Sequence, residues 1–61
     1  MTKRAMANKL GYDYLGKGID SEGNNGFIVR KYGSTNRIKI GDNMNQAREW
    51  LEYKLSQLNN K

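Results

Sequence analysis

The fold is decided by two short runs of sequence, GFIVRKY at residues 26–32 and RIKI at residues 37–40. The second run alternates charged and apolar side chains, which is typical of a strand with one buried face. The first run is rich in β-branched and aromatic residues, and GSTN at residues 33–36 separates the two with a turn composition. Together they predict a β-hairpin whose apolar side another element must cover.

After this hairpin, apolar side chains recur every three or four positions, which predicts an amphipathic helix. Asn43 is a good N-cap, and Gln46 three residues later resembles a capping box. Before the hairpin, a run that starts at Tyr12 leads into a first strand ending around Ile19, followed by a loop at residues 20–26. The apolar stripe of the helix consists of Met44, Ala47, Leu51, Leu55 and Leu58.

The expected fold is therefore α+β, with a three-stranded antiparallel sheet packed on one C-terminal helix. A chain of 61 residues holds a single domain, which we expect at residues 11–61. Residues 1–10 show no convincing apolar period, so we expect a basic flexible arm there, with a helical turn at residues 5–7 as the alternative. The cations of this arm, expected to contact phosphates, are Lys3, Arg4 and Lys9.

Alternation along the strands decides which side chains face the helix. The cations of the third strand cannot be buried unpaired, so Ile38 and Ile40 must face the helix. Phe27 and Val29 join them, because the opposite register would bury Arg30 in mid-strand. The opposite face then carries the residues expected to bind DNA, which are Ile28, Arg30, Tyr32, Arg37, Lys39 and, from the first strand, Lys17.

The charge balance favours a polyanionic partner. Eleven Lys and Arg oppose six Asp and Glu, giving a net charge of +5 and a pI near 9.8. No carboxylate is evident on the cationic face, so we expect it to bind nucleic acid, in particular double-stranded DNA. Arg30 and Arg37 would donate to guanine, while Lys17 and Lys39 would neutralise phosphates. The alternative is that these cations only keep a solvated sheet soluble.

The order and spacing of the elements resemble those of the AP2-type DNA-binding domain and the N-terminal arm-binding domain of phage tyrosine integrases. The matching segments are GI at 18–19, GFIVR at 26–30, RIKIG at 37–41 and NMNQA at 43–47, within about residues 17–55. The resemblance implies that the helix-free face of the sheet enters the major groove. The contacting positions would fall on Arg30, Tyr32, Arg37 and Lys39. Asp20 and Glu22 depart from the family's arginine-rich first strand.

Histidine and cysteine are absent, which removes the commonest general base, nucleophile and transition-metal ligands. We therefore expect a binding protein rather than an enzyme, with no metal or cofactor. No apolar run reaches the ~18 residues of a membrane span, so we expect a soluble, cytoplasmic protein without a membrane partner. A homodimer or a protein partner would strengthen weak DNA binding. The alternatives are an RNA-associated protein, or a small phage-type effector that binds and inhibits a host protein.

Overall fold

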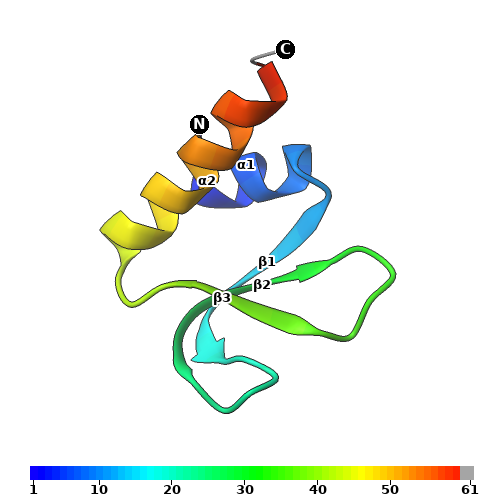
Figure 1. The fold of residues 1–61 in the computed structure, drawn as a ribbon, viewed down its shortest axis with the longest axis vertical. Coiled ribbons are helices and arrows are strands. Elements are labelled where there is room, and N and C mark those ends of the chain that lie inside the picture. The colour runs from blue at the N-terminus through cyan, green and yellow to red at the C-terminus, as the bar shows by residue number, and fades with distance from the viewer. Residues whose placement is uncertain (60–61) are drawn as a thin grey trace.

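The computed structural model describes residues 1–59, and residues 60 and 61, at the end of the expected domain, lie outside the described part (Figure 1). The elements follow the order α1 (Lys3–Lys9), β1 (Tyr12–Ile19), β2 (Asn25–Lys31), β3 (Arg37–Gly41) and α2 (Met44–Asn59). The strands form one antiparallel sheet in the order β1-β2-β3. The predicted α+β architecture with a C-terminal helix is confirmed, and α1 is an additional helix.

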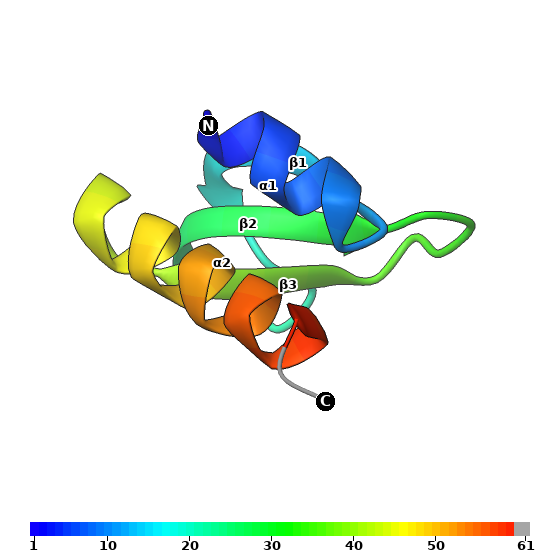
Figure 2. The same ribbon diagram turned by 90° about the horizontal axis from the view of Figure 1, so that it is seen from above.

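Both helices cover the same face of the sheet, with α1 over β1 and α2 along β3 (Figures 1 and 2). Val29 of β2 and Leu51 of α2 are fully buried in the core between the layers, and Ile40 of β3 joins them. Phe27 and Ile38 pack against this cluster from the same face. The predicted set of helix-facing strand residues is therefore confirmed.

The helix α1 stands where the sequence indicated a flexible arm. The Thr2 hydroxyl accepts a hydrogen bond from the Ala5 N–H at 3.1 Å, and Gly11, at φ +87°, takes the left-handed conformation that often ends a helix. A seven-residue helix is marginal on its own, so it depends on packing. Met6 and Ala7 supply that packing, since both are buried in the core. The segment is thus part of the domain, which corrects the expected boundary at residue 11.

The helix α2 begins as predicted but extends beyond the sheet. The Gln46 N–H donates to Asn43 Oδ1 at 2.9 Å, and Gln46 Oε1 accepts from the Asp42 N–H at 2.8 Å, one residue before the N–H that a standard capping box uses. α2 has 16 residues and β3 has 5, or about 24 Å of helix against about 17 Å of strand. Met44 and Leu58, at the ends of the apolar stripe, are consequently 60% and 53% exposed. Met6 of α1, and not Met44, is the methionine that belongs to the buried core.

A β-bulge at Leu15 changes the side on which the end of β1 presents its residues. The register with β2 shifts between Tyr14 and Gly16, and Gly16 adopts φ +79°, a left-handed conformation that favours glycine. The extra residue reverses the alternation of the side chains that follow it. Lys17 therefore lies opposite Phe27 and belongs to the helix-bearing side of the sheet, not to the cationic face where it was expected.

Substitution of Met6 tests whether α1 belongs to the core. Met6→Ala should lower the free energy of unfolding by about 2–5 kcal/mol, because it leaves a cavity in a buried site. Met44→Ala, at an exposed methionine, is the matched control and should change it little. Urea unfolding followed by Trp50 fluorescence measures both. Equal effects of the two substitutions would mean that α1 is not packed as described.

Candidate nucleic-acid interface

The side of the sheet that faces away from both helices, here called the outer face, carries a row of charged residues. Asp13, Arg30 and Arg37 lie directly opposite one another on β1, β2 and β3. Arg30 Nη2 lies 3.3 Å from Asp13 Oδ2, so the guanidinium is paired with a carboxylate. Arg30 Nε is buried without a hydrogen-bond partner among the described residues, so this pairing is imperfect. The expectation of an outer face without a carboxylate is therefore wrong.

The two predicted DNA contacts on β3 also have partners. Arg37 Nε donates to the carbonyl oxygen of Ile19 at 2.8 Å. The Lys39 ammonium forms an ion pair with Asp42, three residues along the chain. Neither cation is presented as a free group, although both remain on the outer side of the sheet as predicted.

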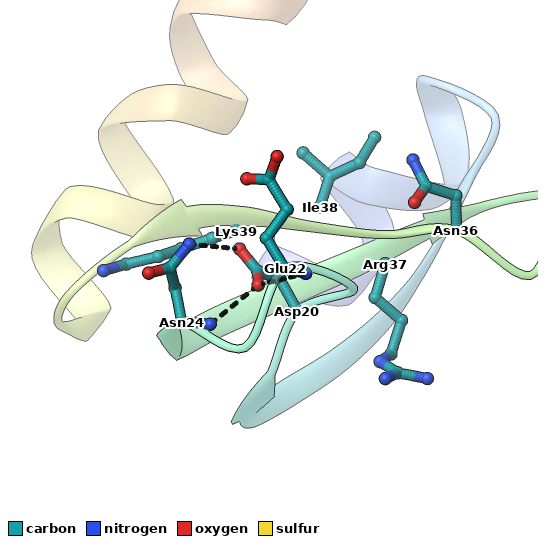
Figure 3. A pocket seen from close by; sticks show the side chains of 7 residues that line it. All are labelled: Asp20, Glu22, Asn24, Asn36, Arg37, Ile38 and Lys39. Atoms are coloured by element: carbon teal, nitrogen blue, oxygen red, sulfur yellow. Dashed lines mark hydrogen bonds between the residues drawn. The ribbon is translucent and has the colours of Figure 1, made fainter.

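The loop after β1 is organised by a carboxylate. Asp20, which is 7% exposed, accepts hydrogen bonds from the Glu22 N–H at 2.9 Å, the Asn24 N–H at 2.8 Å and the Asn24 side-chain amide at 3.3 Å (Figure 3). The hydrogen bond from the Asn24 backbone is the chief reason why the pKa of Asp20 lies below its ordinary value, and the Glu22 N–H acts in the same direction.

This loop attaches to the free edge of β3 and helps to close the outer face. Ser21 donates its N–H to the Arg37 carbonyl at 3.2 Å, and its hydroxyl accepts from the Arg37 N–H at 2.8 Å. The loop thus passes to the side of the sheet that lies away from the helices (Figure 1). Ile28 is only 4% exposed, and a Cβ at Gly18 would lie 3.1 Å from its Cδ1. Ile28 is therefore not exposed in the way that a contact with DNA requires.

The loop and β3 enclose a hollow of ≈ 450 Å³ in which charges of both signs meet (Figure 3). Its lining residues are Asp20, Glu22, Asn24, Asn36, Arg37, Ile38 and Lys39. The outer face and this hollow contain three cations, but four carboxylates surround them: Asp13, Asp20, Glu22 and Asp42. A phosphate backbone would meet as much repulsion as attraction here.

The remaining predicted cations gather on α1 and β1, which pack together. We call Lys3, Arg4, Lys9 and Lys17 the basic surface. Within residues 1–59 none of them forms a salt bridge. Arg4, Lys9 and Lys17 are exposed, and Lys3 is half-buried. No carboxylate lies on α1, so nothing on this helix neutralises its cations.

The position of Arg4 links the two elements of the basic surface. Burial raises the pKa of the Tyr14 phenol, and the positive charge of Arg4 partly offsets this rise, so the Arg4 charge acts on a side chain of β1. Lys17 lies three residues after Tyr14 on the same strand, roughly 10 Å further along the backbone. Lys3 and Arg4 stand in the first turn of α1, where positive charge opposes the helix dipole. Their charge is thus not explained by helix stability.

Tyr32 lies beside α1 rather than on the outer face. The chain turns at this residue, and the Tyr32 hydroxyl donates to Asn8 Oδ1 at 2.6 Å. Its backbone N–H donates to the Gly11 carbonyl at 3.1 Å, yet 56% of the residue's surface stays exposed. The predicted contact residues therefore fall into two groups, one on the outer face and one on the basic surface. Tyr32 lies beside the basic surface.

Comparisons with protein-family models, curated proteins and solved structures find no match to this chain. The resemblance to the AP2 and integrase arm-binding domains stays a prediction. Across the described residues, no group of three or more Asp, Glu, His or Cys side chains is placed to hold a metal ion. None of the helices within residues 1–59 has the length and apolar character needed to cross a membrane.

Acid titration tests the role of Asp20. Its folded-state pKa is below the ordinary value of 3.8, so the ionised carboxylate stabilises the fold at neutral pH, and this stabilisation is lost as the pH falls below that value. Asp20→Asn should lower the free energy of unfolding at neutral pH, and the difference from the wild type should shrink in acid. Glu22→Gln removes a charge from the same loop and is the control. A difference that stays constant across the acid range would contradict this role.

Proposed function

We propose that the protein binds nucleic acid through the phosphate backbone, using the basic surface of α1 and β1 rather than the outer face of the sheet. The observation that carries the proposal is the distribution of carboxylates. Those of the sheet and its loops lie among the cations of the outer face, while the cations of the basic surface have no salt-bridge partner within residues 1–59. Of the two groups of predicted contacts, the basic surface is the one whose cations have no ion-paired carboxylate within residues 1–59, which favours it for a polyanion.

Binding of this kind derives its free energy mainly from the release of counterions. Each neutralised phosphate contributes about −0.9 to the slope of log affinity against log salt for duplex DNA, and about −0.7 for a single strand. With all cations of the basic surface engaged, the slope should be about −3 to −4. Lysines act as flexible point charges, so this surface tracks a backbone and offers little sequence readout.

Reading of the major groove by the outer face, the expectation from the family resemblance, would carry a larger cost. Arg30 would have to leave Asp13, and that carboxylate would then face the phosphates without a partner. Ile28, a further expected contact, is already buried within the protein. The observed contacts therefore favour the basic surface as the nucleic-acid interface.

The alternative of a protein-binding effector would require an exposed apolar patch. The large apolar side chains that are exposed lie on several elements: Met1 before α1, Leu15 and Ile19 on β1, Tyr32 after β2, and Met44, Tyr53 and Leu58 on α2. They mark no single helix face or strand as a contact surface, so we propose no protein target.

Neutralising the basic surface tests the proposal. Arg4→Gln and Lys17→Gln should each weaken binding to a labelled oligonucleotide and reduce the magnitude of the salt slope by about 0.7 to 0.9, because each removes one phosphate contact. Arg48→Gln is the matched control, since this exposed arginine of α2 already has Glu52 as its partner. Fluorescence anisotropy across a salt series measures all three.

Two results would overturn the proposal. If Arg30→Gln and Arg37→Gln weaken binding while Arg4→Gln and Lys17→Gln do not, the outer face is the interface. If the folded wild-type protein binds neither single-stranded nor duplex oligonucleotides at low salt, the protein does not bind nucleic acid. Thermal unfolding of each variant confirms that it remains folded.

A further inference from the structure

We infer that the basic surface prefers single-stranded nucleic acid and that Tyr32 stacks on one unpaired base. The inference rests on the proposed function and adds the class of ligand to it. It is carried by the juxtaposition of an exposed, fixed aromatic ring with the cations of α1.

The ring of Tyr32 is held at two points. The hydroxyl donates to Asn8 on α1 at 2.6 Å, and the backbone N–H donates to the Gly11 carbonyl at 3.1 Å. These bonds engage the tip of the side chain and the main chain, while 56% of the residue's surface remains open. A ring fixed in this way loses little further rotamer entropy when a ligand packs against it.

Cations flank, along the chain, the two residues that the hydrogen bond joins. Asn8, which holds the phenol, is adjacent in sequence to Lys9 and lies four residues after Arg4, on the same face of the helix. Lys31 directly precedes Tyr32 and forms no salt bridge in the part of the chain that the structure describes. A nucleotide whose base lies on the ring would thus have cations near its own and its neighbouring phosphates. This combination of an aromatic ring and a basic track is the pattern by which proteins bind single strands.

The same arrangement should bind a duplex less tightly than a single strand. Paired bases show only their edges in the grooves, so their π-faces are closed to a side chain at the surface. An unpaired base offers its face without first being unstacked, and each base stacked on an aromatic side chain contributes about 1–3 kcal/mol, which corresponds to roughly 5- to 150-fold in affinity. Phosphate contacts alone would not favour single strands, whose charge density is lower.

A purely structural role for Tyr32 is the competing explanation. In that case the phenol only fastens α1 to the turn between β2 and β3, and the exposed ring has no function. The two roles depend on different atoms. Tyr32→Phe and Asn8→Ala remove the hydrogen bond and keep the ring, whereas Tyr32→Leu removes the ring as well.

The experiment compares binding of a labelled oligothymidylate and a labelled duplex, each of about 12 nucleotides per strand. The wild type should bind the single strand more tightly, and Tyr32→Leu should weaken this binding roughly 5- to 150-fold with a smaller effect on the duplex. Tyr32→Phe and Asn8→Ala keep the ring but release its tip, so they should lose far less affinity for the single strand than Tyr32→Leu does. Tyr53→Leu is the matched control, because Tyr53 is 60% exposed on α2 and its hydroxyl also bonds an amide side chain, Gln57, at 2.8 Å.

Tyr32→Trp keeps the inference testable even if Tyr32→Leu does not fold. The substituted ring should retain single-strand affinity, and its fluorescence should change on addition of oligothymidylate by more than the change seen in the wild type, whose only tryptophan is Trp50. The inference is overturned if the duplex binds as tightly as the single strand and Tyr32→Leu behaves like Tyr53→Leu. If Arg4→Gln still weakens binding in that case, the proposed function stands without the stacking. If the folded wild type binds no nucleic acid at all, both the stacking inference and the proposed function are wrong.

Discussion

The burial of Val29 determines the chemistry of both sides of the sheet. Val29 has no exposed surface and packs with Leu51 in the core. Because side chains alternate along a strand, Arg30 must point to the opposite side. Asp13 of β1 lies directly across from it there and takes up the guanidinium. The constraint that builds the core therefore also pairs off one of the two arginines that were expected to contact guanine.

The packing of α1, in contrast, leaves cations of the basic surface exposed. Met6 and Ala7 supply two of the six buried residues in the core cluster of the described chain, so the N-terminal segment is held as a helix. Arg4 and Lys9 remain exposed on it. In a chain this small, where burial of surface is limited, the helix that completes the core also concentrates positive charge beside β1. Stability and the proposed binding thus depend on the same contact.

Local patterns were sufficient to predict the strands, the cap at Asn43 and the side of the sheet that the helix covers. The same alternation also places Asp13 outward, between Tyr12 and Tyr14, so its pairing with Arg30 was within reach of the sequence. The helix α1 left weaker signals, namely a capping threonine and a glycine at its end. The bulge at Leu15 left almost none, because one inserted residue reverses a strand without changing its composition.

Tertiary contacts account for the remaining differences. The loop after β1 is held against β3 by the bonds between Ser21 and Arg37, which are 16 residues apart in the chain. Sequence patterns describe neighbours along the chain, and they carry no sign that this loop turns toward the outer face. Tyr32 is a similar case, since its partner Asn8 is 24 residues away. The residues of the interface were therefore predictable in part from the sequence. Their location could be found only from the three-dimensional structure.

The most direct test of binding through the basic surface is a titration of the isotope-labelled protein with oligothymidylate, followed by the chemical shifts of its backbone amides. If the basic surface binds the strand, the largest shift changes fall on α1, on β1 around Lys17 and at Tyr32. Changes concentrated on β3 and on residues 20–24 would contradict it, because the ligand would then occupy the outer face.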